Sequence, residues 1–266
     1  MRYSNLHTHT VFSDGAHSVR ENIESAIEKN MLSLGISDHS FTACDTSYCI
    51  KKSDYENYYK EINSLKDEYK GRIPVYLGLE MDYFSEIDKE KFDYIIGSVH
   101  YIVKDGFCYP IDHSALQQQN CIADLFGGNM VDMAKYYYDL VVEHARKNKP
   151  DVMGHFDVIT KFSVFDENNE EYKDYSLQAL KETLKHCNYI EVNTGAMSRK
   201  VKDAPYPNNF LLENILDLGG EVVLGADSHN KANLIYAFDS SVEMLKNIGF
   251  DHISVFNGKD FDKVNI

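Results

Sequence analysis

The stretch Tyr3-Ser4-Asn5-Leu6-His7-Thr8-His9 places two histidines, one residue apart, at the end of a short strand-like run, and Asp14 follows. Alternate side chains of a strand point to the same face, so His7 and His9 can contact one ion. Imidazole and carboxylate together are typical ligands of divalent transition metals. The stretch therefore predicts a strand whose carboxyl end carries part of a metal site.

The same arrangement recurs along the chain, because short apolar or β-branched runs alternate with longer amphipathic stretches. This alternation predicts an α/β fold with a parallel sheet. In a parallel α/β barrel, active sites collect at the carboxyl ends of the strands. The predicted strands cover residues 3–7, 33–37, 75–80, 94–99, 152–155, 189–193, 222–226 and 252–256.

The amphipathic stretches predict helices, and two of them begin with a capping box, at Ser18 with Glu21 and at Ser53 with Glu56. In a capping box the hydroxyl and the carboxylate satisfy free N–H groups of the first turn. Further helices are predicted over residues 131–147, 176–186, 209–216 and 240–247.

Residues 105–129 do not follow the alternation of apolar runs and amphipathic stretches, because glycines, a proline and three consecutive glutamines interrupt it. We expect an irregular insertion beside the site there. Nothing else in the sequence resembles a linker, so a single domain over residues 1–266 is expected.

Composition and charge exclude several classes of protein. The chain has 266 residues and a formal net charge of −15, which disfavours nucleic acid as a partner. Its apolar runs are too short to span a bilayer, and the N-terminus does not read as a secretory signal. The five cysteines are odd in number and form no CxxC pair, so we expect inert thiols in a reducing cytoplasm: Cys44, Cys49, Cys108, Cys121 and Cys187.

Histidines and carboxylates concentrate at the predicted strand ends, where six of the eleven histidines fall. Chance placement would scatter them over helices as well. A metal site at this end of the barrel is therefore predicted from His7, His9, Asp14, Asp38, His39, Glu80, His100, His155, Asp157, Asp227 and His229.

These residues, in this order and spacing, resemble the motifs of the PHP family, the polymerase and histidinol phosphatase superfamily of metal-dependent phosphoesterases. The resemblance spans essentially the whole chain. The segments Gly97-Ser98-Val99-His100 and Gly154-His155-Phe156-Asp157 look most like its histidinol-phosphate phosphatases. The resemblance implies a distorted seven-stranded (β/α) barrel, with residues 252–256 at its periphery. It also implies hydrolysis of L-histidinol phosphate to L-histidinol and phosphate in histidine biosynthesis.

The resemblance further implies three divalent ions, of zinc, iron or manganese. The first would be held by His7, His9, Glu80 and Asp227, the second by Glu80, His100 and His155, and the third by Asp14, His39 and His229. These ions would give the site the local positive charge that a phosphate dianion requires, despite the acidic chain.

Catalysis is expected to use water activated between two ions, without a protein nucleophile. We expect catalytic roles for Asp14, Glu80, Asp227 and Asp157. Asp157 is either an acid for the leaving group or a group that orients a metal-bound histidine. We expect substrate contacts from Arg199, Lys161, His39 and Asn193, and Lys161 stands where similar phosphatases carry arginine.

Three other interpretations remain open at this point. The chain could be another PHP phosphoesterase, acting on a nucleotide, a cyclic phosphodiester or a phosphotyrosine. It could also be a non-catalytic metal-binding module or a hydrolase of C–N bonds. In the favoured interpretation the partner is a small phosphorylated substrate, with no nucleic acid and no membrane, and the protein is a monomer or homodimer.

Overall fold

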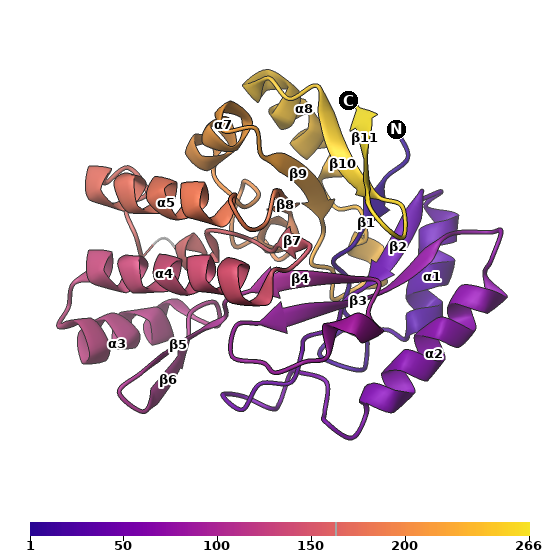
Figure 1. Ribbon diagram of the computed structural model, residues 1–266, viewed down its shortest axis with the longest axis horizontal. Helices are drawn as coiled ribbons and strands as arrows, with labels where there is room; N and C mark the ends of the chain where they lie inside the picture. Colours follow the sequence, from indigo (N-terminus) through magenta and orange to yellow (C-terminus); the bar gives the residue numbers. More distant parts are fainter. Residues whose placement is uncertain (163) are drawn as a thin grey trace.

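Seven parallel strands form a nearly closed barrel in the computed structural model, which describes residues 1–162 and 164–266 (Figure 1). Neighbouring strands pair in the order β1 (Ser4–Asn5), β2 (Ser33–Ile36), β3 (Val75–Asp82), β4 (Tyr94–Ser98), β7 (Val152–Met153), β8 (Tyr189–Asn193) and β9 (Glu221–Gly225). The first and last strands meet just beyond their ends, at a parallel bridge between Thr8 and Ser228. There the His9 amide donates to the Ser228 carbonyl at 2.9 Å. The predicted α/β barrel is confirmed.

Helices surround the barrel, and Figure 1 shows α1 and α2 flanking β2 and β3 while α4 and α5 lie together elsewhere on the outside. The helices are α1 (Val19–Glu28), α2 (Tyr55–Glu68), α3 (Ala115–Phe126), α4 (Met130–Asn148), α5 (Glu170–Thr183), α6 (Gly195–Ser198), α7 (Asn209–Asp217) and α8 (Phe238–Ile248). Short 3-10 turns occur at Lys89–Lys91, Val158–Thr160 and Lys231–Asn233. Within the described residues, no helix has both the length and the apolar character needed to cross a membrane.

The two predicted capping boxes have different outcomes. The Ser18 box that starts α1 is confirmed, with its hydroxyl and the Glu21 carboxylate both bonded to backbone N–H groups. The Ser53 box is wrong, because Asp54 is the N-cap of α2 and the Ser53 hydroxyl donates instead to the Asp54 carboxylate at 2.9 Å. Helix α5 begins well before residue 176, because Asn169 caps it by accepting from the Tyr172 amide.

The segment 105–129, expected to be an irregular insertion, is not irregular. Strands β5 (Tyr101–Lys104) and β6 (Phe107–Pro110) form an antiparallel hairpin, and α3 follows. The hairpin turn is Asp105-Gly106, with positive φ at both residues, as two-residue hairpin turns require. Ser114 caps the start of α3 and Gly127, in the left-handed region, ends it, so the polar and glycine residues that looked irregular are its boundaries.

A tightly packed interior fills the barrel. It comprises Leu6, Tyr94, Ile96, Val152, Val223 and Phe256. Phe256 comes from β10 (His252–Phe256), which pairs with β11 (Phe261–Asn265) outside the barrel sheet, as expected for the peripheral eighth strand. A side chain at Gly78 would collide with the Tyr94 ring, so the large residue inside the barrel requires glycine on its neighbour.

Candidate metal centre

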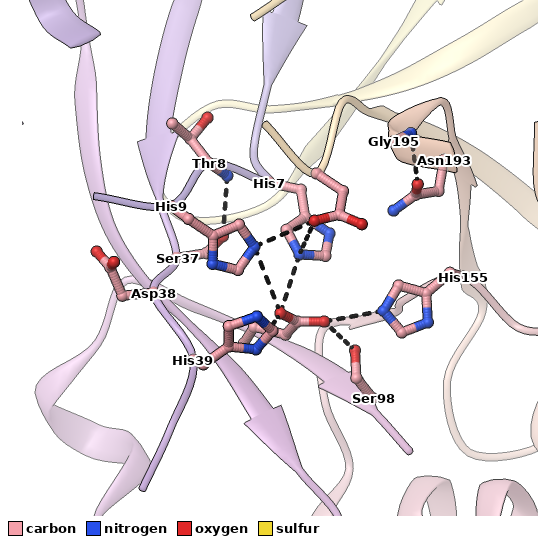
Figure 2. A network of polar contacts seen from close by, with 12 residues as sticks. His7, Thr8, His9, Ser37, Asp38, His39, Ser98, His155, Asn193 and Gly195 are labelled. Carbon is pink, nitrogen blue, oxygen red and sulfur yellow. Dashed lines mark hydrogen bonds and ion pairs between the residues drawn. The ribbon is translucent and has the colours of Figure 1, made fainter. Parts of the chain in front are cut away.

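The strand ends of the barrel bring the predicted histidines and carboxylates together, as Figure 2 shows for several of them. His7 and His9 follow β1 and are fully buried. Asp227 follows β9 with a φ of 44°, in the left-handed region that is unfavourable for non-glycine residues. This turn lets both Asp227 and His229 reach the same site from one strand end. Backbone strain of this kind is typical of functional sites.

The Glu80 carboxylate, at the end of β3, lies at the centre of the cluster. Its Oε2 is 3.2 Å from His7 Nε2 and 2.8 Å from His39 Nδ1. Its Oε1 is 2.9 Å from His155 Nε2 and 3.2 Å from His100 Nε2. Because each of its oxygens faces imidazole nitrogens, this carboxylate could bridge two ions.

A second group of ligand atoms gathers around Asp14. His229 Nε2 lies 3.1 Å from Asp14 Oδ2, and His39 Nε2 lies 3.8 Å from Asp14 Oδ1. His9 is shared with the first group, because its Nε2 lies 3.3 Å from Asp227 Oδ1 while its Nδ1 lies 3.8 Å from Asp14 Oδ1. The two groups are therefore continuous.

The described residues contain three groups that could each hold a metal ion. Within each group, the ligand atoms lie within 4.8 Å of one another. The groups are His7, His9 and Glu80; His39, Glu80 and His100; and His9, Asp14, His39 and His229. Several of these atoms are buried and, although other ligand atoms lie near them, make no contact with the geometry of a hydrogen bond: His7 Nε2, both ring nitrogens of His9, and Glu80 Oε2. Buried polar atoms normally find partners. Unpartnered nitrogen and oxygen donors converging in one place fit a group of divalent metal ions.

The protonation states of the cluster favour metal binding as well. Burial and the charges of His229 and His39 lower the pKa of His9 to about 3, so its ring is neutral at neutral pH and one of its nitrogens offers a free lone pair. Burial alone would raise the pKa of Glu80, but His7, His39 and His100 hold it well below its usual range. The central carboxylate is therefore ionised.

Three carboxylates lie behind the cluster, and two of them, Glu191 and Asp82, were not identified as site residues from the sequence. Glu191 Oε1 lies 2.6 Å from His7 Nδ1, and Asp82 Oδ2 lies 3.3 Å from His100 Nδ1. Asp38 accepts from the backbone amides of Thr10 and Ser13, which shapes the loop that carries Asp14. Carboxylates in these places fix the orientation of metal-binding groups. A sequence signal could have found Asp82, because it lies two residues after Glu80 on the same strand.

A cavity of about 500 Å³ opens onto the cluster. Arg199, at the end of α6, lines it, and its guanidinium donates to Asp227 Oδ2 at 2.9 Å and to His229 Nδ1 at 3.3 Å. Lys161 also lines it and pairs with Asp112 at 3.3 Å. Both predicted basic residues, together with His39, therefore face the same space as several candidate metal ligands.

Among the residues predicted to act in catalysis or substrate binding, Asn193 and Asp157 do not line this cavity. The Asn193 side chain donates to Glu191 Oε2 and accepts from the Gly195 amide, both at 2.9 Å. Asp157 is fully buried, and its Oδ2 accepts from the Asn208 amide at 3.1 Å. Burial raises the pKa of Asp157 to about 7, although the charge of Lys202 opposes this shift. The structure thus places Asn193 behind the metal ligands and Asp157 against the start of α7.

The cysteines differ from the expectation of five inert thiols. Cys44 and Cys108 form a disulfide, while Cys49, Cys121 and Cys187 are free and buried. The bridge joins the loop after β2 to β6, and residues from both segments line the cavity. Sequence spacing could not reveal it, because 64 positions separate the two cysteines.

Comparisons with known proteins agree with this geometry. The model of the PHP domain family matches residues 5–195. A probable histidinol-phosphatase of Deinococcus radiodurans is 28% identical over 256 residues, covering 92% of this chain and 93% of that protein. The histidinol-phosphatase of Lactococcus lactis is 26% identical, covering 99% and 97%. A crystal structure of the Lactococcus lactis histidinol phosphate phosphatase, complexed with zinc, L-histidinol and phosphate, matches with a TM-score of 0.71 at 23% identity, covering 98% of this chain and 99% of that one. This structural likeness shows the fold.

Proposed function

The chain belongs to the PHP domain family, and on this basis we propose that it hydrolyses L-histidinol phosphate to L-histidinol and phosphate in histidine biosynthesis. The observation that carries the proposal is the Glu80 carboxylate among the site histidines, beside a cavity that Arg199 also lines. Relatives that carry the name histidinol-phosphatase align over nearly their whole length, which supports this substrate over others in the family.

Three divalent ions, of zinc, iron or manganese, are part of the proposal. The proposed ligands are His7, His9, Glu80 and Asp227 for the first, Glu80, His100 and His155 for the second, and Asp14, His39 and His229 for the third. The unpartnered donor atoms of His7, His9 and Glu80 support this assignment. Bound ions would supply positive charge for the phosphoryl oxygens and lower the pKa of a nearby water.

The chain's own residues would hold the phosphoryl group in place. Arg199 can donate to a phosphoryl oxygen through N–H groups that Asp227 does not occupy, because its side chain is 35% exposed toward the cavity. Lys161 and His39 line the same space and are the other proposed phosphate contacts. With Asp14, Glu80 and Asp227 fixed as ligands, catalysis rests on positioning and electrostatic stabilisation.

Local charge explains how an acidic protein would bind an anionic substrate. Only three of the nine proposed ligands are carboxylates, so three divalent ions leave a formal surplus of about three positive charges at the site. The overall charge of −15 then serves solubility and supports the absence of a nucleic-acid partner. A cytoplasmic location and a monomer or homodimer complete the proposal.

The test is steady-state phosphate release from L-histidinol phosphate, beside nucleotides, sugar phosphates and p-nitrophenyl phosphate, on protein of known metal content. We expect kcat/KM above about 10⁴ M⁻¹s⁻¹ for L-histidinol phosphate, well ahead of the panel. Chelation should abolish release, and zinc or manganese should restore it. A different phosphate ester that leads the panel would reject this substrate and keep the chain among the other PHP phosphoesterases.

A further inference from the structure

The cavity has two chemically different sides. One side carries the metal ligands and Arg199, which suit a phosphate. The other side is built by the loop after β2, the start of β5 and the segment that follows β6, and it is acidic and aromatic. Its residues include Asp45, Tyr48, Tyr101, Asp112 and His113. A substrate that places its phosphate on the first side must present its alcohol portion to the second.

Asp112 is the carboxylate on the second side with the most defined position. It stands shortly after β6, with its side chain 29% exposed, and its Oδ2 accepts from Lys161 Nζ at 3.3 Å. Among the described residues, no hydrogen bond to its Oδ1 is present. Burial would raise the pKa of Asp112, but Lys161, His100 and His155 lower it to about 2. The carboxylate is therefore ionised, close to the metal ligands, and free to accept another hydrogen bond.

The other carboxylate on this side is less suited to such a contact. Asp45 is exposed, and its Oδ1 already accepts from the Ser47 amide at 2.8 Å. The disulfide between Cys44 and Cys108 joins its loop to β6, so both carboxylates belong to one connected wall of the cavity.

We propose that Asp112 binds the ammonium group of the leaving alcohol, so that the cavity selects phosphate monoesters of amino alcohols. The proposal rests on the phosphatase function above and specifies its substrate class. In L-histidinol phosphate the ammonium is two carbons from the ester oxygen, so a carboxylate that binds it must lie near the metal ligands, as Asp112 does. Lys161 donates to Oδ2 of Asp112 and so holds the carboxylate in place, which leaves Oδ1 for the ammonium group.

The test compares two substrates of equal size, 2-aminoethyl phosphate and propyl phosphate, on the metal-loaded enzyme. The variants are Asp112→Asn and, as a matched control, Asp124→Asn, an exposed acid on α3. We expect the wild type to prefer the amine. Asp112→Asn should lower kcat/KM for the amine by about tenfold to a hundredfold, as expected for a lost charged hydrogen bond, and change that for propyl phosphate by less than about twofold. Asp124→Asn should change neither.

An equal loss on both substrates would overturn the proposal, because it would mean that Asp112 acts on the phosphate through Lys161. No loss on either would also overturn it. Lys161→Gln should keep the amine preference, since the carboxylate remains. Metal content and melting temperature of each variant show whether folding is intact.

The two proposals can fail separately. An enzyme that prefers the amine through Asp112, yet hydrolyses L-histidinol phosphate slowly, would reject the proposed substrate and keep the ammonium site. An enzyme that hydrolyses L-histidinol phosphate well, with no effect of Asp112→Asn on the amine, would keep the function and reject the site.

Discussion

The Nδ1 atom of His7 lies 2.6 Å from Glu191 Oε1, and both side chains are buried. Glu191 also accepts from the His155 amide at 2.9 Å, so one carboxylate behind the site supports residues from two strand ends. This contact fixes the ring of His7 with its Nε2 directed toward Glu80.

Replacing Glu191 by Gln should therefore weaken metal binding while leaving the ligands in place. We expect a loss of about 10–100-fold in metal affinity or in kcat/KM, the usual effect of changing a group that orients a ligand. Metal titration followed by elemental analysis measures it. Glu182→Gln, on the exposed surface of α5, is the control. Full metal content and full activity in Glu191→Gln would show that Glu191 has no such role.

Arg199 should contribute to activity both through its charge and through the planar shape of its guanidinium, and two substitutions separate these effects. Arg199→Ala removes both the proposed phosphate contact and the hydrogen bond to Asp227, so kcat/KM should fall by about a hundredfold or more. Arg199→Lys retains the charge but loses the planar guanidinium, and we expect an intermediate loss. Steady-state kinetics on protein of equal metal content measures both. An Arg199→Ala enzyme with unchanged kcat and KM would exclude Arg199 from the phosphate site.

Asp157 should make the stability of the protein depend on pH. Its pKa is about 7 in the folded state, above the value near 4 expected in the unfolded state. The protonated side chain of Asp157 therefore makes its full contribution to the stability of the folded protein below pH 4. This contribution is lost as the pH rises through 7. Asp157→Asn keeps an acceptor for the Asn208 amide and removes the charge, so it should stabilise the protein by a few kcal/mol at pH 8 and have little effect at pH 4.

Thermal unfolding of the metal-free protein at the two pH values checks this expectation. Because Asp157 does not line the cavity, kcat should remain within about twofold. A large loss of kcat at equal metal content would instead support the acid role expected from the sequence.

The disulfide between Cys44 and Cys108 should be detectable by counting thiols. Under denaturing conditions without reductant, three thiols should react, and five should react after reduction. Cys108→Ser should lower the free energy of unfolding by about 2–4 kcal/mol relative to the oxidised protein, the usual range for a native disulfide. Cys121→Ser, which breaks no disulfide, should leave the thiol difference between the two conditions at two. Five reactive thiols before reduction would contradict the bridge.

The α/β barrel and the convergence of the proposed ligands could be predicted from the sequence for one physical reason. Each proposed ligand lies at or just after the end of a short apolar strand, where a parallel barrel collects its strand ends. His39, His100 and His155 were found by this rule alone, without knowledge of what lies between them. The ordered motifs then fixed their relation to Glu80.

Contacts that depend on distant residues could not be predicted. Glu191 lies inside a strand and its partner His7 is at the other end of the chain, so nothing local marks it. The disulfide is hidden for the same reason. The hairpin at Asp105-Gly106, in contrast, could have been predicted, because that dipeptide is a strong local turn signal between strands.

The bridge between Thr8 and Ser228 has a consequence for how the protein is made. The barrel closes where the beginning and the last part of the chain meet, and the proposed ligands come from both sides of that junction, His7 and His9 from one side and Asp227 and His229 from the other. During synthesis, His7 and His9 are made first. They can meet Asp227 and His229 only after nearly the whole chain has been made. With the proposed ligands, full metal loading would therefore follow closure of the barrel in each newly made molecule.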